Sequence, residues 1–194
     1  MKTLLAFSGS SRIGSLNTLL LEKAELMAAA RGATVETIDL RELDLPLYDG
    51  DFEAANGLPQ GARELKEAMR EADGFLIASP EYNSHPTPLL INAMDWASRP
   101  GGGDDAPLSA FKGKYAALMA ASPGALGGIR SLWALRCFLQ NVGVVIAPTL
   151  AAVGGANEDM FSDENFEDAS NGRRLAAAID EVLALLGCPA IPAP

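Results

Sequence analysis

The polar stretch at residues 9–17 (GSSRIGSLN) contains the residue types that most often bind phosphate. A strand predicted at 2–8 ends just before it, and apolar residues at helical spacing begin after Ser15. Such a junction directs backbone N–H groups and the positive end of the helix dipole to one point, and Arg12 can bind a phosphate in a bidentate manner. The stretch therefore predicts a phosphate site. It matches neither G-x-G-x-x-G nor the P-loop, and an ordinary turn with a helix N-cap remains the alternative.

Two further loops have compositions that suit a ligand. In residues 79–88 (SPEYNSHPTP) the prolines hold the backbone extended and remove donors. This leaves the N–H groups of Glu81, Tyr82 and Asn83 free for a flat heteroaromatic ligand, beside which the Tyr82 ring could lie. Residues 122–128 (SPGALGG) have little side-chain bulk, which lets a ligand approach the backbone. A proline-stiffened loop with a surface tyrosine and a simple helix-start turn are the alternatives.

The elements around these loops alternate between strand and helix along the whole chain. This pattern predicts an α/β protein with one domain (1–194) and a doubly wound, five-stranded parallel sheet in the flavodoxin-like order 2-1-3-4-5. Ligands of such sheets bind beyond the carboxyl ends of the strands, where the three loops would lie. An acidic stretch at 157–168 is expected to be a solvated loop. The predicted strands are 2–8, 34–39, 74–79, 114–121 and 142–146, and the predicted helices are 15–30, 62–73, 89–98, one from 129 and one ending at 187.

Composition excludes several classes of function. The chain has 194 residues, of which 48% are hydrophobic, and a net charge of −10. An acidic chain argues against nucleic acid, whose binding needs a basic surface. It has no run of eighteen apolar residues, which argues against a membrane span, and its first apolar run is too short for a signal peptide, so a cytoplasmic location is expected. His85 is the only histidine, and Cys137 and Cys188 form no C-x-x-C motif, so no metal site is expected and Cys137 is predicted to be a buried thiol.

Taken together, the three motifs GSSRIGSLN, SPEYNSHPTPLLINAMDWASRP and ASPGALGG resemble those of the NADPH-dependent FMN reductase family. The resemblance implies an FMN site in which the first loop holds the phosphate, the second lies against the flavin ring and the third borders the ring or the ribityl chain. Residues 85–88 (HPTP) and Ile91 depart from the family's usual segment over the flavin. The implied phosphate residues are Ser10, Ser11, Arg12, Ser15, Leu16 and Asn17, and the implied ring residues are Pro80, Glu81, Tyr82, Asn83, Ser122 and Gly124.

The resemblance also implies an oxidoreductase. Hydride would pass from NADPH or NADH to flavin N5, and an oxidant would then take the same place in a ping-pong reaction: a flavin, quinone, azo compound or metal oxyanion. Since the flavin carries the chemistry, no catalytic side chain is expected. His85 is expected to shape the mouth of the pocket, and Glu81 to partner a neighbouring helix. A homodimer or homotetramer is implied, with Trp96 and Trp133 either in the core or at its interface.

The competing hypothesis is an electron carrier, a flavodoxin-like module that holds FMN and passes single electrons to a partner protein. The acidic charge would suit such a role. The arginine in the phosphate loop argues against it, because flavodoxins usually carry a T-x-T-G-type loop there. A flavin-free regulatory or structural domain is the third hypothesis.

Overall fold

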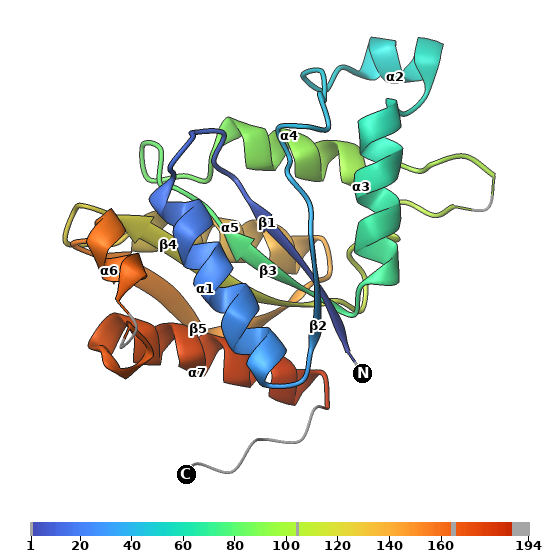
Figure 1. Cartoon of the computed structure of the whole chain (residues 1–194). Coiled ribbons are helices and arrows are strands. Elements are labelled where there is room, and N and C mark those ends of the chain that lie inside the picture. Colours follow the sequence, from blue (N-terminus) through green and yellow to red (C-terminus); the bar gives the residue numbers. More distant parts are fainter. Residues whose placement is uncertain (1, 104, 164–165, 188–194) are drawn as a thin grey trace.

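Five parallel strands form a single sheet in this computed structural model, which describes residues 2–103, 105–163 and 166–187 (Figure 1). The strand order is β2-β1-β3-β4-β5, and every neighbouring pair is parallel. The predicted flavodoxin-like order is therefore confirmed. Every residue of β3 is buried, as expected for a central strand covered on both faces. The strands are β1 (Thr3–Ser8), β2 (Thr34–Thr37), β3 (Gly74–Ala78), β4 (Tyr115–Ser122) and β5 (Val145–Gly154).

Helices cover both faces of the sheet. On one face α1 and α7 pack on the strands, together with α6 and a short 3-10 helix, η1. On the other face lie α3, α4 and α5. Two apolar cores result, one on each side of the sheet. The helices are α1 (Leu16–Ala30), α2 (Gly50–Asn56), α3 (Gln60–Glu71), α4 (Pro88–Ala97), α5 (Ile129–Asn141), α6 (Glu158–Ser162), η1 (Phe166–Asp168) and α7 (Ser170–Leu185).

The last strand differs from its prediction. The apolar run 142–146 was expected to be the whole strand, whereas β5 begins at Val145 and continues to Gly154. Pro148 lies inside it. An edge strand tolerates a proline because the outer edge of its backbone has no hydrogen-bonding partner, and among the described residues β5 pairs with β4 alone. The carboxyl end of β5 consequently lies eight residues further along the chain than predicted.

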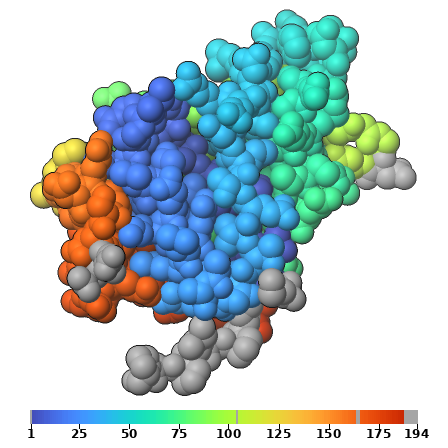
Figure 2. All heavy atoms as spheres, in the orientation of Figure 1, coloured from blue at the N-terminus to red at the C-terminus, as the bar shows by residue number. Residues whose placement is uncertain are grey.

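The acidic stretch 157–168 was wrongly predicted to be a solvated loop. It contains α6 and η1, whose Phe161 and Phe166 are buried against the core that includes α1. Their rings pack 5.5 Å apart, measured between centroids. In Figure 2 the atoms of α6 (orange) lie against the start of α1 (dark blue). The structure therefore brings an acidic helix to the beginning of α1.

Three smaller differences and outcomes concern α2, the cysteines and Trp96. The helix α2 was not predicted, because its sequence has no apolar period; Asp49 begins it by accepting hydrogen bonds from the N–H groups of Asp51 and Phe52. Cys137 is exposed, so the buried thiol is wrong, and Cys188 lies outside the described residues. Trp96 is a core residue.

Candidate functional site

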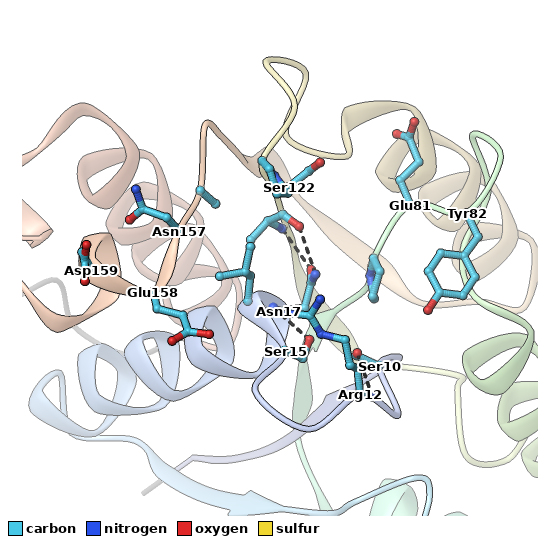
Figure 3. A pocket seen from close by; sticks show the side chains of 15 residues that line it. Ser10, Arg12, Ser15, Asn17, Glu81, Tyr82, Ser122, Asn157, Glu158 and Asp159 are labelled. Carbon is cyan, nitrogen blue, oxygen red and sulfur yellow. Dashed lines mark hydrogen bonds between the residues drawn. The ribbon is translucent and has the colours of Figure 1, made fainter.

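A cleft of about 680 Å³ opens at the carboxyl ends of the strands (Figure 3). The connections after β1, β3, β4 and β5 all contribute to it. Most of its lining was predicted from the sequence. The lining residues are Ser10, Arg12, Ser15, Leu16, Asn17, Pro80, Glu81, Tyr82, Ala121, Ser122, Pro123, Ala156, Asn157, Glu158 and Asp159.

The β1–α1 loop is held in shape by its own hydroxyl and guanidinium groups. The N–H of Arg12 donates to Ser10 Oγ at 3.3 Å, and Arg12 Nη2 donates to the carbonyl oxygen of Gly14 at 3.0 Å. Ser15 caps α1 by accepting from the N–H of Asn17 at 3.2 Å. Arg12 is exposed, and within the described ranges no carboxylate pairs with it. A guanidinium with no paired carboxylate among the described residues thus stands beside the positive end of a helix, as anion binding requires.

Asn17 links α1 to β4. Its Nδ2 donates to the carbonyl oxygen of Ala121 at 3.0 Å, and its Oδ1 accepts from the N–H of Ala121 at the same distance. The side chain is buried, and one of its amide hydrogens is left for a ligand in the cleft. This pair of hydrogen bonds to the β4 backbone fixes the start of α1 over the end of β4.

The loop after β3 contains a tight turn. The N–H of Tyr82 donates to the carbonyl oxygen of His85 at 2.9 Å, and the N–H of His85 donates back at 3.0 Å. Asn83 and Ser84 both have positive φ, 53° and 68°, which is the pattern of a type I′ turn. The expectation of a free N–H on Tyr82 is therefore wrong, because the turn uses it. The N–H groups of Glu81 and Asn83 make no hydrogen bond with the described part of the chain.

Glu81 joins this loop to α5. Its carboxylate accepts from the backbone N–H groups of Arg130 and Ser131, at 3.1 and 3.2 Å, and from Arg130 Nε at 2.8 Å. Burial acts to raise the pKa of Glu81, but the hydrogen bonds from Arg130 and Ser131 outweigh it and lower that pKa below its ordinary value. The expectation that Glu81 partners a neighbouring helix is confirmed, and its charge is neutralised at the start of α5.

The remaining predicted residues lie in neighbouring hollows. Asn83 and Gly124 line a second cavity of about 500 Å³ between the β3–α4 and β4–α5 loops, which shares Glu81 and Ser122 with the main cleft. Ser11 lines a third cavity, of about 240 Å³, on the far side of the β1–α1 loop. His85 is exposed and lines none of the three. The structure therefore brings the three predicted loops together around one edge of the sheet.

Two parts of the site were missed. The wall from Ala156 to Asp159 comes from the β5–α6 connection, which the strand-end rule would have selected had β5 been placed correctly. Thr87, buried behind the cleft, donates to the carbonyl oxygen of Gly9. The sequence did indicate a role for Thr87, since threonine before a predicted helix is a common N-cap.

Among the described residues no group of histidines, cysteines or carboxylates has the arrangement of a metal site, and no helix is long and apolar enough to cross a bilayer.

Residues 2–158 match the family model described as NADPH-dependent FMN reductase. The chain belongs to this family. A quinone reductase of Escherichia coli is 32% identical over 165 residues, which is 84% of this chain and 83% of that protein. An NAD(P)H-dependent FMN reductase of Pseudomonas aeruginosa is 39% identical over 132 residues. That match covers 68% of this chain and 66%, just under two thirds, of the Pseudomonas protein.

Solved structures agree with the family. The flavoenzyme NAD(P)H:(acceptor) oxidoreductase FerB of Paracoccus denitrificans superimposes with a TM-score of 0.77 and 29% identity, covering 95% of this chain and 98% of that one. The resemblance of the three motifs to the NADPH-dependent FMN reductase family is therefore confirmed. Of the residues that line the cleft, all but Asp159 lie within the part of the chain that the family model matches.

Proposed function

We propose that this chain binds FMN in the cleft and uses it to transfer electrons from NADPH or NADH to a small oxidant. One observation carries the proposal: a single cleft joins a phosphate-binding end, at Arg12 and the start of α1, to a wall formed by Pro80, Glu81 and Tyr82. The two ends suit the two ends of FMN. The names of the relatives, which include FMN and quinone reductases, support the same function.

The residues present fit the cofactor. The phosphate would be held by Arg12, by the hydroxyl groups of Ser10 and Ser15, and by backbone N–H groups around Ser11 and at the start of α1. Asn17 can add its remaining amide hydrogen. A helix start that presents hydroxyls and a guanidinium without a paired carboxylate suits a dianion.

The ring would lie against the backbone of the β3–α4 loop, where the N–H groups of Glu81 and Asn83 are open, with Ser122 and Gly124 on its other border. When bound, FMN supplies hydride chemistry at its own ring. The protein holds and orients it, and no side chain need act as an acid or base. Tyr82, 51% exposed, stands at the rim, where an aromatic ring can flank a flat co-substrate.

We further propose a ping-pong order in which the nicotinamide and the oxidant use the same place over the flavin in turn. A shared place requires an oxidant that is small and flat, and a quinone meets this requirement. A quinone is also what the Escherichia coli relative reduces according to its name. A flavin, an azo compound or a metal oxyanion are the other members of the proposed substrate class.

The experiment that tests the function is an absorbance spectrum of the protein after mixing with FMN and desalting, followed by anaerobic addition of NADPH. Flavin bands that persist and bleach within the mixing time support the reductase. Bands that persist but bleach slowly would favour an electron carrier. A protein that retains no flavin on desalting and also fails to quench FMN fluorescence in an equilibrium titration would contradict the FMN site.

We also propose a homodimer or homotetramer that uses the exposed face of α5, in a cytoplasmic protein. Trp133 on this face is 55% exposed, and the Arg136 guanidinium lies 5.6 Å from the centroid of its ring. A large exposed aromatic beside an arginine is typical of interface centres. Light scattering of Trp133→Glu, compared with the unmodified protein, tests this: a smaller species is expected, and an unchanged mass would contradict the proposed face.

A further inference from the structure

The fourth wall of the cleft is acidic, although the cleft is proposed to hold a phosphate. This wall consists of residues 156–159, and it places two carboxylates, Glu158 and Asp159, in the same cleft as Arg12. Asn157 fixes the wall by accepting from the N–H of Met160 at 2.8 Å, which begins α6. The carboxylates therefore stand on an ordered helix start beside the phosphate loop.

Glu158 comes close to the loop itself. Its Oε1 lies 3.9 Å from the position that a Cβ would take at Gly14, the residue whose carbonyl oxygen accepts from Arg12. Figure 3 shows Glu158 extending from α6 toward the start of α1. Within the described part of the chain no cation pairs with Glu158. An uncompensated carboxylate and the Arg12 guanidinium thus flank the same residue of the loop.

We infer that Glu158 weakens the binding of the FMN phosphate, so that FMN exchanges with solution instead of remaining permanently bound. This inference rests on the proposed function. A phosphate monoester carries a charge of about −1.5 to −2 at pH 7. A carboxylate held beside its binding loop repels it, while Arg12 on the other side attracts it. The net charge of −10 adds to the repulsion rather than relieving it.

The charges of Arg12 and Glu158 act on different steps, the binding of FMN and its dissociation. Arg12 and the start of α1 give the phosphate its place, and Glu158 raises the rate at which it leaves. The two charges together set how tightly FMN is held and how long it stays bound.

Riboflavin separates charge from packing, because it has the same ring and ribityl chain without the phosphate. The test is the dissociation constant of each flavin, measured by fluorescence quenching for the unmodified protein and for Glu158→Gln. FMN is expected to bind about three- to tenfold more tightly to the variant, with a slower dissociation rate in stopped flow, and riboflavin equally to both. The gain should shrink as salt is raised.

Glu64→Gln is the matched control. Glu64 is exposed on α3, which packs on the opposite face of the sheet, and its replacement changes the net charge by the same amount. FMN binding by this variant is expected to be unchanged.

Three results would overturn the inference. Equal FMN affinity in Glu158→Gln and the unmodified protein would show that the carboxylate does not act on the phosphate. Equal tightening of FMN and riboflavin would show that the effect is packing. Equal tightening by Glu64→Gln would show that only net charge matters. If neither flavin binds any of the proteins, the proposed function fails as well. Flavin binding therefore distinguishes failure of the inference alone from failure of the proposed function.

Discussion

Thr87 and Gly9 are joined by a 2.6 Å hydrogen bond in which the threonine hydroxyl donates to the glycine carbonyl oxygen. The same hydroxyl accepts from the N–H of Leu90 at 3.3 Å and so caps α4. The Thr87 side chain packs directly against Gly9, where a Cβ would lie only 2.8 Å from Thr87 Oγ1. One buried side chain therefore couples the loop proposed for the phosphate to the loop proposed for the flavin ring.

Replacing Thr87 with valine keeps the shape of the side chain and removes both hydrogen bonds. The Gly9 carbonyl is then buried without a partner and α4 loses its cap, so the free energy of unfolding should fall by about 2–3 kcal/mol. Urea unfolding measures this loss. Thr87→Ser, which keeps the hydroxyl, should recover more than half of it, and a serine variant as unstable as the valine one would show that packing of the methyl group dominates.

The central part of the fold could be predicted because its signals are local. The run 74–79 is continuously apolar, and a strand buried on both faces must be so. The start of α1 was predicted to within one residue, because Ser15 is a strong N-cap. By contrast β5 was misplaced because Pro148 is a breaker in most contexts, and only the position of β5 at the sheet edge makes it harmless.

The parts of the site that were predicted are those on loops whose preceding strand was placed correctly. The three loops after β1, β3 and β4 follow from the strand-end rule, whereas the acidic wall at 156–159 was lost with the end of β5. Hydrogen bonding inside a loop is harder to foresee. That Tyr82 donates to His85 depends on positive φ at Asn83 and Ser84, and neither residue type requires that conformation.

Arg12→Ala should weaken FMN binding about 10- to 100-fold, because a charge-assisted phosphate contact is lost. Riboflavin affinity should change less than twofold, since it has no phosphate for the guanidinium to bind. Arg12 is exposed, and among the described residues its side chain bonds to Gly14 alone, so the free energy of unfolding should change by less than about 0.5 kcal/mol. Fluorescence titration and urea unfolding test both parts. An unchanged FMN affinity would remove the phosphate assignment.

Ser84 stands in the left-handed region with φ of 68°, at the second central position of its turn. Glycine adopts this conformation without the steric cost that a Cβ brings. We expect Ser84→Gly to raise the free energy of unfolding by about 0.5 kcal/mol and Ser84→Val to lower it by more than about 1 kcal/mol, because a branched Cβ is poorly tolerated there. Urea unfolding of the two variants, Ser84→Gly and Ser84→Val, measures both changes. If glycine destabilises and valine does not, the turn is not strained at this residue.

Lys66 and Asp105 form a buried ion pair, with 2.7 Å between Nζ and Oδ2. Hydrogen bonds from Lys66 and then from Ser109 lower the pKa of Asp105 from 3.8 to about 2. A carboxyl whose folded pKa is depressed stabilises the fold above its unfolded pKa and loses that contribution as pH falls toward the folded value. The pair should therefore contribute roughly 2 kcal/mol at neutral pH that disappears between about pH 4 and pH 2.

The double variant Lys66→Met with Asp105→Asn tests this without changing the net charge or leaving one buried charge unpaired. Between about pH 5 and pH 2 the unmodified protein should lose roughly 2 kcal/mol more of its unfolding free energy than the double variant. Other carboxyls with lowered pKa, such as Asp73 and Glu53, are present in both proteins and cancel in the difference. Asp105→Asn alone should be destabilised by about 3–5 kcal/mol at neutral pH, because Lys66 then stays buried without a counter-ion. Parallel curves for the unmodified protein and the double variant would contradict the depressed pKa of Asp105.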